Sequence, residues 1–316
     1  MTEAASRQMI FAISSYGEIA DEIVVALKSL RRDSERGEIE TRTFADGERY
    51  MRIRSTVRGH DAVLIGGTVD DRSTLDVFDL ACGLVAEGCR SLKIVIPFFG
   101  YSTMERAVKP GEVVTAKTRA RILSAVPNAP FGNEVWLLDL HSEGIPFYFE
   151  GPVKTRHLYA KSLILDEAKH LAAGEAFLLG APDAGRAKWV ESLANDLSVP
   201  AAFVFKRRQD DGSVKLTGVN LPIQGVHVVL YDDMIRTGGS ILQAASAYRD
   251  AGAKKISLIA THGLFSGEAH TKLLRSGLFD SVSVTDSHPN AKLATASGAI
   301  RLLKTAPLLA KHLAAE

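Results

Sequence analysis

Short apolar runs alternate with longer amphipathic segments along this 316-residue chain. The short runs are rich in β-branched residues and apolar throughout, which is typical of strands buried on both faces of a parallel sheet. The longer segments repeat their apolar positions with a period of 3.6, which predicts helices. The expected strands are residues 9–14, 61–68, 92–101, 135–141, 176–185, 201–208, 226–233, 255–263 and 281–287. The expected helices include residues 19–30, 75–89, 115–126 and 186–197.

This alternation occurs twice, so the sequence predicts an α/β protein with two doubly wound parallel-sheet domains. A chain of 316 residues is long enough for two domains of ordinary size. The periodicity is interrupted near residues 150–158, and we place a first domain at residues 1–153 and a second at 154–299. We expect the segment from about residue 300 to 316 to be helical and to pack on the first domain.

Composition narrows the classes of function. The chain is 46% hydrophobic and 24% charged, which is the balance of a soluble globular protein, and its net charge of +1 predicts neither nucleic acid nor a membrane surface as a partner. No apolar run approaches the roughly 20 residues that span a bilayer, and the N-terminus lacks a signal-peptide core, so we expect a cytoplasmic protein. Cys82 and Cys89 lie one heptad apart on an expected helix, which favours buried apolar residues over a disulfide or metal site.

Polar side chains gather where several expected strands end. Ligands of open parallel sheets bind beyond the carboxyl ends of the strands, so these segments predict one composite site. The segments are DLHS (139–142), PDAG (182–185), KRR (206–208), DDMIRTGGS (232–240) and THG (261–263).

The loop of residues 237–240 has the composition of an anion site. Thr237, Gly238, Gly239 and Ser240 lie between an expected strand and an expected helix. Glycine N–H groups and a helix N-terminus attract an anion, and the two hydroxyl groups can donate further hydrogen bonds. The alternative is an ordinary turn in which Ser240 caps the helix.

Two carboxylates precede this loop. Asp232 and Asp233 end the expected strand, where they can accept hydrogen bonds from the 2- and 3-hydroxyl groups of a ribose or hold a cation. A phosphate cradle beside a diol acceptor suits a sugar phosphate. The chain has neither a GxxxxGK[ST] motif nor a GxGxxG motif after its first strand.

The segment VVLYDDMIRTGGS resembles the ribose-phosphate loop of phosphoribosyltransferases and of phosphoribosyl pyrophosphate synthetases, also called ribose-phosphate pyrophosphokinases. The resemblance to the synthetases extends in order from about residue 9 to 287, whereas simple transferases have one such domain and would leave the first half unexplained. The other similar segments are RTFADGERYMRI, VIPFFGYSTMERAVKPGEVVTAKTRARIL, LLDLHSEGIPFYFEGP, GAPDAGRAKWVESLA, FVFKRR and THGLFSGEAHTKL. Both domains would then be of the phosphoribosyltransferase type.

Details of the first domain are similar to the second, plant-type class of synthetase. In the common class an Arg-Gln pair follows the tyrosine of the PFFGY segment, and here these positions hold Thr103 and Met104. The acidic residue that often precedes the loop threonine is Arg236 here, and the second class is also not acidic at that position.

The resemblance implies a reaction between ATP and ribose 5-phosphate that gives phosphoribosyl pyrophosphate and AMP, with Mg²⁺ as cofactor. The first domain would bind ATP and the second ribose 5-phosphate, in a homo-oligomer whose adenine site is near a subunit interface. One alternative is a phosphoribosyltransferase that consumes phosphoribosyl pyrophosphate. Another is a non-catalytic homologue that regulates a true synthetase.

The resemblance places Phe44, Asp46, Glu48, Arg106 and His141 at the ATP site. The first three occupy alternate positions and would point to one side of an extended chain, where the ring can stack on adenine and the carboxylates can accept from its amino group. Read without the resemblance, these three fit a half-exposed strand or hairpin, and Arg106 fits a charge on a surface helix.

The remaining implied residues handle metal and phosphate. His141 and Asp183 would hold Mg²⁺, for which Asp183 supplies the preferred oxygen ligand; the alternatives are a structural histidine and an Asp turn before glycine. Lys206 and Arg208 would be catalytic, because phosphoryl-type transfer needs cations around the equatorial oxygens. The alternative for these two is a solvated charged face. Asp232, Asp233 and residues 237–240 would bind ribose 5-phosphate.

Overall fold

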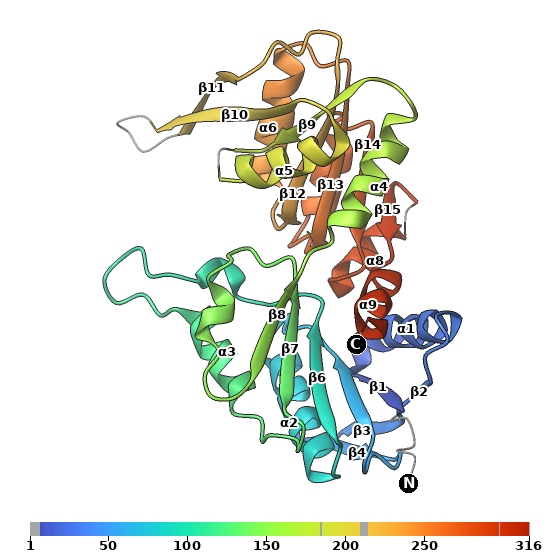
Figure 1. Ribbon diagram of the computed structural model, residues 1–316. Helices are drawn as coiled ribbons and strands as arrows, with labels where there is room; N and C mark the ends of the chain where they lie inside the picture. Colours follow the sequence, from blue (N-terminus) through green and yellow to red (C-terminus); the bar gives the residue numbers. More distant parts are fainter. Residues whose placement is uncertain (1–6, 184, 209–213, 297, 316) are drawn as a thin grey trace. The chain divides into compact units, whose positions relative to one another are not determined.

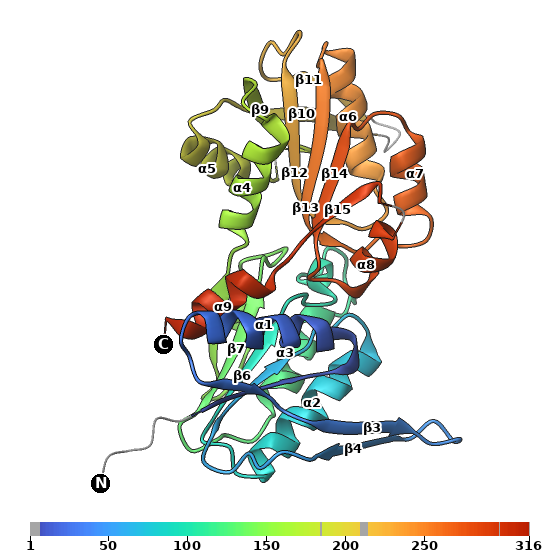
Figure 2. The ribbon, with the colours of Figure 1, turned by 90° about the vertical axis from the view of Figure 1, so that its right-hand side faces the viewer.

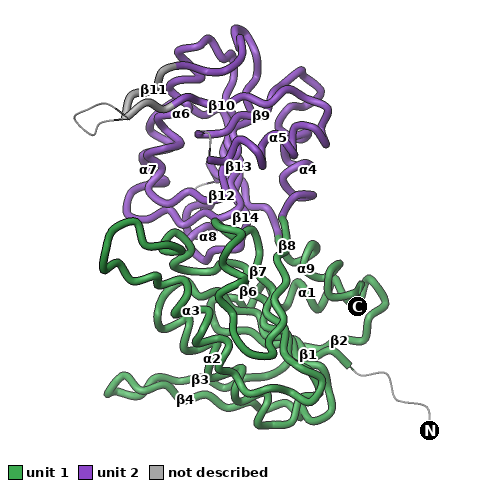
Figure 3. Tube along the Cα trace, turned by 60° about the vertical axis from the view of Figure 1, so that its left-hand side comes forward, with its two compact units in different colours: residues 1–159, 305–316 green, residues 160–304 purple. Residues whose placement is uncertain are grey.

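The computed structural model describes residues 7–183, 185–208, 214–296 and 298–315 (Figure 1). The chain divides into two compact units, which are distinguished in Figure 3. Unit 1 comprises Met1–Tyr159 and Thr305–Glu316, and unit 2 comprises Ala160–Lys304. The chain therefore leaves unit 1 once, forms unit 2 and returns.

Unit 1 contains a six-stranded parallel sheet in the order β2-β1-β5-β6-β7-β8. Its strands are β1 (Gln8–Ala12), β2 (Ser34–Arg36), β5 (Asp61–Ile65), β6 (Ser91–Ile96), β7 (Asn133–Leu138) and β8 (Lys154–Leu158). Its helices are α1 (Gly17–Ser29), α2 (Asp71–Ala86), α3 (Thr115–Ser124) and α9 (Ala306–Ala314), with 3-10 turns η1 (Ser14–Tyr16), η2 (Ser102–Met104) and η3 (Ile145–Tyr148). The central strands are apolar because both faces are covered, and Trp136 on β7 is fully buried.

The strand order reverses direction at β1, which sends successive right-handed crossovers to opposite faces of the sheet. Helices α1 and α9 pack side by side on one face, while α2 lies on the other (Figure 2). Helix α2 begins four residues before the expected position because Asp70 is its N-cap, with Oδ1 accepting from the Ser73 N–H at 2.7 Å.

A two-stranded antiparallel hairpin projects from the sheet of unit 1 (Figure 2). It is formed by β3 (Ile39–Thr43) and β4 (Arg49–Ile53), which confirms the hairpin that was the alternative for residues 44–48, although neither strand was among those expected. Both strands are rich in charged residues and half-buried at best, so they lack the apolar run that identified the other strands.

Unit 2 contains a seven-stranded sheet in the order β11-β10-β9-β12-β13-β14-β15, parallel except for the β10–β11 pair. The strands are β9 (Phe177–Ala181), β10 (Ala201–Arg208), β11 (Val214–Val219), β12 (His227–Ile235), β13 (Lys255–Gly263), β14 (Ser281–Thr285) and β15 (Ile300–Leu303). The helices are α4 (Lys161–Ala172), α5 (Ala187–Leu197), α6 (Gly239–Asp250), α7 (Ala269–Arg275) and α8 (Pro289–Thr295). The two parallel sheets with helices between their strands confirm the predicted fold class.

The expectation of one continuous terminal helix from about residue 300 was wrong. Residues Ile300–Leu303 form strand β15, which pairs in parallel with β14 and buries Ile300. Helix α9 starts only at Ala306, with Pro307 in its first turn, where a residue without a backbone N–H is tolerated. The Arg-Leu-Leu-Lys sequence before it has no pattern that separates a short edge strand from a helical turn.

Helix α9 belongs to unit 1 and packs against α1. Two side chains from the start of the chain reach the carbonyl groups at its end. The Gln8 side-chain amide donates to the Leu313 carbonyl at 3.4 Å, and the Arg32 guanidinium donates to the Ala314 carbonyl. No helix in the described part of the chain is long and apolar enough to cross a membrane.

Candidate active site

The loop after β12 is built to receive an anion. Gly238 is the N-cap of α6 and has φ +78°, a left-handed conformation that favours glycine. Among the described residues, no side chain caps the first turn of α6, so its backbone N–H groups remain for a ligand. Thr237 and Ser240 are exposed beside them. Ser240 is the second residue of the helix, so the alternative in which it is the N-cap was wrong.

The two carboxylates of β12 lie just before this loop. Strand β12 continues to Ile235, two residues beyond its predicted end, because Met234 and Ile235 still pair with β13. Asp233 is buried and donates its N–H to Asp232 Oδ1 at 2.9 Å. Burial raises the pKa of Asp232 well above its ordinary value, and the neighbouring carboxylate of Asp233 raises it further.

A basic residue contacts both carboxylates. Arg186 precedes α5, and its guanidinium forms an ion pair with Asp233 Oδ2, while its Nε lies 3.9 Å from Asp232 Oδ1. This guanidinium lowers the pKa of Asp232 against the effect of burial. Sequence analysis missed Arg186. The available signal was its position, because a basic residue at a helix N-terminus is electrostatically unfavourable unless a nearby anion compensates.

Asp183 adopts the turn conformation that was its structural alternative. It follows β9, and its Oδ1 accepts a hydrogen bond from the Gly185 N–H at 2.9 Å. An ionised carboxylate has about four acceptor positions, so this bond is compatible with a cation at the remaining ones. Asp183 therefore stays a candidate Mg²⁺ ligand whose orientation is fixed by the turn.

The two predicted catalytic cations are on β10. The backbone of Lys206 and Arg208 pairs with β11 in antiparallel register, with an irregularity between Phe205 and Lys206. The side chains of Lys206 and Arg208 lie outside the part of the structure that is described.

In unit 1, the backbone before His141 is held by a second histidine. The Leu140 N–H donates to His157 Nε2 at 2.9 Å, and Asp139, with φ +39°, donates its N–H to the Leu158 carbonyl. Burial lowers the pKa of His157, which favours the neutral form that can accept this bond. Sequence analysis missed His157, because it lies on β8, a strand of mixed polarity.

Tyr101, which follows β6, forms a cluster with Asp71 of α2 and Arg119 of α3. The Tyr101 hydroxyl donates to Asp71 Oδ1 at 2.6 Å, and Arg119 donates to the same oxygen at 2.5 Å while stacking over the tyrosine ring. The Tyr101 hydroxyl and Arg119 lower the pKa of Asp71. This cluster orients the backbone immediately before η2, which carries Thr103 and Met104.

The other predicted ATP residues of unit 1 are on exposed segments. Arg106 lies in an irregular segment rather than a surface helix, with its side chain 77% exposed and its Nε 3.6 Å from Glu105. Phe44, Asp46 and Glu48 do not form one side of an extended strand, because they occupy the tight turn between β3 and β4. The Phe44 N–H donates to the Glu48 carbonyl at 2.8 Å, and Asp46 Oδ1 accepts from the Glu48 N–H at 3.0 Å.

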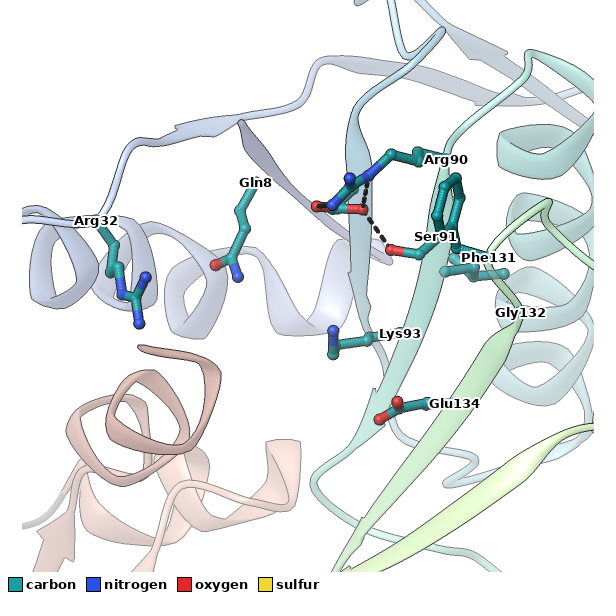
Figure 4. Close-up of a pocket in the computed structure, with 10 residues that line it drawn as sticks. Gln8, Arg32, Arg90, Ser91, Lys93, Phe131, Gly132 and Glu134 are labelled. Atoms are coloured by element: carbon teal, nitrogen blue, oxygen red, sulfur yellow. Dashed lines mark hydrogen bonds and ion pairs between the residues drawn. The ribbon is translucent and has the colours of Figure 1, made fainter. Parts of the chain in front are cut away.

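A polar cavity of about 280 Å³ lies at the opposite, amino-terminal edge of the unit 1 sheet (Figure 4). Its groups are engaged in structural contacts. Arg90 donates two hydrogen bonds to Asp61, at 2.9 and 2.7 Å, and Ser91 donates one at 2.6 Å. Glu134 accepts from Trp136 Nε1 at 2.8 Å. The bonds to Asp61 join the starts of the adjacent strands β5 and β6, and ligands of open α/β sheets bind at the other edge.

Comparisons with known proteins agree with this arrangement. The family model of the N-terminal domain of ribose phosphate pyrophosphokinase matches residues 8–126, and that of the phosphoribosyl synthetase-associated domain matches residues 181–314. The ribose-phosphate pyrophosphokinase of Gloeobacter violaceus is 33% identical over 80% of this chain and 75% of its own length. The chain belongs to the ribose-phosphate pyrophosphokinase family.

Two further members show how far the likeness extends. The chloroplastic ribose-phosphate pyrophosphokinase 2 of Oryza sativa is 30% identical over 89% of this chain and 68% of its own length. The crystal structure of phosphoribosylpyrophosphate synthetase from Mycobacterium smegmatis superposes with a TM-score of 0.83 at 28% identity and covers 98% of both chains. The family therefore accounts for both units rather than for one shared domain.

The candidate site contains donor atoms of the type that Mg²⁺ prefers. Asp183, Asp232 and Asp233 offer carboxylate oxygens, which this ion prefers. In the described ranges, no three His, Cys, Asp or Glu side chains form a metal cluster. That is compatible with Mg²⁺, which is usually bound through one or two carboxylates together with substrate phosphates. Cys82 and Cys89 are free thiols; Cys89 is buried as expected, whereas Cys82 is only half-buried.

Proposed function

We propose that this protein transfers the diphosphoryl group of ATP to the C1 hydroxyl of ribose 5-phosphate, giving phosphoribosyl pyrophosphate and AMP. Membership of the ribose-phosphate pyrophosphokinase family supports the reaction. The structural observation that most directly supports the proposed reaction is the junction of β12 and α6. There a carboxylate pair whose side chains are only 14% and 6% exposed is followed within a few residues by a helix N-terminus that has no side-chain cap.

Unit 2 is proposed to bind ribose 5-phosphate. The 5-phosphate accepts hydrogen bonds from backbone N–H groups at the start of α6 and from the hydroxyl groups of Thr237 and Ser240. Asp232 and Asp233 accept hydrogen bonds from the ribose hydroxyl groups. Together these contacts fix the sugar at two ends and leave C1 oriented for attack.

Unit 1 is proposed to bind ATP through Phe44, Asp46, Glu48, Arg106 and His141. The exposed position of Phe44, 45% accessible at the tip of a projecting hairpin, supports an adenine site shared with a second copy of the chain in a homo-oligomer. An aromatic ring presented in this way offers a face on which a base can stack. His157 keeps the peptide before His141 in place.

The reaction needs positioning and charge neutralisation rather than covalent catalysis. The C1 oxygen attacks the β-phosphorus, the bond between the α- and β-phosphates breaks, and AMP leaves while the C1 hydroxyl loses its proton. Lys206 and Arg208 are proposed to neutralise charge on the reacting phosphates. Mg²⁺, held by His141 and Asp183, would supply further charge neutralisation on the phosphates when bound.

One coupled assay tests this proposal. Purified protein with ATP, ribose 5-phosphate and Mg²⁺ should form AMP and phosphoribosyl pyrophosphate in equal amounts. A phosphoribosyltransferase would instead consume phosphoribosyl pyrophosphate with a nucleobase and would not need ATP. A non-catalytic homologue would form no AMP alone and would change the rate of an added synthetase.

A further inference from the structure

The carboxylate pair of β12 is contacted by a cationic side chain of the same unit, Arg186. Asp232 and Asp233 are adjacent in sequence, and their side chains are only 14% and 6% exposed. Two carboxylates this close and this buried repel one another, and both lose hydration that stabilises their charge. The guanidinium of Arg186, itself 19% exposed, contacts one carboxylate and lies 3.9 Å from the other.

The geometry of Arg186 suits this role. A planar guanidinium is always charged and presents several N–H donors in fixed directions, so it can face two carboxylates at once. Each ionised carboxylate has about four acceptor positions. Contact with Arg186 therefore favours the charged form of the pair against the effect of burial and orients it, while leaving capacity for hydrogen bonds from hydroxyl groups of a ligand.

We propose that Arg186 is a positioning residue for ribose 5-phosphate. It acts as the built-in counter-cation that keeps Asp232 and Asp233 ready to accept the ribose hydroxyl groups without a divalent ion between them. This inference rests on the proposed function, because it assigns the ribose to that carboxylate pair. It adds that ribose 5-phosphate binds in the absence of Mg²⁺, and that this binding depends on Arg186.

The same contact ties the ribose site to the loop that carries Asp183. Arg186 follows the Asp183 turn directly and precedes the first residue of α5. Its ion pair with Asp233 holds the end of this loop against β12. Loss of the guanidinium should thus disturb the ribose contacts and the orientation of Asp183 together.

The test is calorimetric titration of ribose 5-phosphate, without ATP, in a metal chelator and again in excess Mg²⁺. Wild-type protein should bind in both conditions with similar affinity. Arg186→Ala should bind at least about tenfold more weakly in the chelator, the scale on which groups that orient a ligand-binding side chain act. Mg²⁺ should restore most of this loss, because a divalent ion can take the place of the guanidinium between two carboxylates.

Arg275→Ala is the matched control, because Arg275 is an exposed arginine of the same unit on α7. It should bind as wild type does in both conditions. Arg186→Lys keeps the positive charge and should retain binding in the chelator, whereas Arg186→Gln should not. If Arg186→Ala does not fold, the comparison of Lys with Gln at this position decides the question.

Four results would overturn the inference. They are wild-type binding that requires Mg²⁺, wild-type affinity of Arg186→Ala in the chelator, equally weak binding by the Lys and Gln variants, or weak binding of Arg186→Ala in both conditions with no rescue by Mg²⁺. The last would indicate a purely structural role. The proposed function fails separately. In that case binding would depend on Arg186 as described, but the wild-type protein would form no AMP from ATP and ribose 5-phosphate.

Discussion

Tyr248 offers a quantitative test of how α6 holds the strands that carry the candidate site. This tyrosine is fully buried on α6, and its hydroxyl lies 3.0 Å from the Ala181 carbonyl and 3.0 Å from the Ala202 carbonyl. Ala181 ends β9 just before the Asp183 turn, and Ala202 lies on β10, which continues to Lys206 and Arg208. Burial raises the pKa of Tyr248, so the phenol stays neutral and keeps its proton for donation.

The magnitude follows from counting donors. The phenol has one hydrogen, so its two contacts form one shared hydrogen bond rather than two full ones. A hydrogen bond contributes about 0.5–1.5 kcal/mol net, and a buried acceptor left without its donor costs about 1–3 kcal/mol. Tyr248→Phe removes only the hydroxyl and should lower the free energy of unfolding of unit 2 by about 1–3 kcal/mol. For a domain near 150 residues this lowers Tm by about 2–12 °C.

The two tryptophans allow unit 2 to be followed alone. Trp136 lies in unit 1 and Trp189 in unit 2, and the sequence has no other tryptophan. In a Trp136→Phe background, fluorescence during urea unfolding reports unit 2. Tyr50→Phe on the hairpin of unit 1 is the control and should leave this transition unchanged.

An unchanged midpoint for Tyr248→Phe would refute the reasoning, because it would mean that the shared hydrogen bond contributes nothing net to unit 2. A lower midpoint with a different denaturant slope would also contradict it. Such a slope change indicates an altered denatured or native state rather than one lost hydrogen bond.

Four further outcomes are expected. Lys206→Ala and Arg208→Ala should lower kcat more than they raise KM while keeping the fold, and near-normal kcat in steady-state assays of both would refute their catalytic assignment. Asp233→Asn should weaken ribose 5-phosphate binding far more than ATP binding by calorimetry, and equal losses would point to a folding defect. Because burial lowers the pKa of His157, the folded protein binds its proton less readily than the unfolded chain, so stability should fall as pH drops below about 6.5. Urea titrations at pH 7.5 and 5.5 should show a smaller loss of stability for His157→Gln than for the wild-type protein. Equal losses in the two proteins would exclude His157 as the source of the pH dependence. GTP, CTP and UTP should partly replace ATP, because the sequence lacks the Arg-Gln pair of the common class, and a preference for ATP above about 10⁴-fold in kcat/KM would exclude such breadth.

The sequence predicted the fold well where strands are apolar throughout. Strands β12 and β13 were found almost to their ends, since nothing but a buried position explains such runs. The loop after β12 was predictable because glycine at Gly238 and two adjacent acids are local signals. Strand β8 was missed and the hairpin was only an alternative, because their burial depends on neighbours rather than on an apolar run of their own.

Residues whose role depends on a contact with a residue distant in the sequence were not identified from the sequence. Arg186 meets Asp233 across 47 positions of the chain, and His157 reaches the Leu140 N–H across 17. Neither pair has a spacing that identifies it, because the contact arises only when β9 lies beside β12 and β7 beside β8. The periodicity of apolar residues locates helices and strands along the chain. The contacts of Arg186 and His157 depend instead on the order of the strands in the sheet.

The return of the chain to unit 1 constrains the order in which the protein can be completed during synthesis. The bond from Gln8 to the Leu313 carbonyl joins positions 305 residues apart, so α1 cannot acquire its neighbour α9 until Ala306–Ala314 have been made. Unit 2 is continuous and can close its own sheet while that partner is still missing. Synthesis proceeds at about 5–20 residues per second, so the apolar face of α1 stays exposed for on the order of ten seconds or more before α9 can pack on it. Nascent unit 1 is therefore exposed to aggregation and to chaperones for longer than unit 2 is.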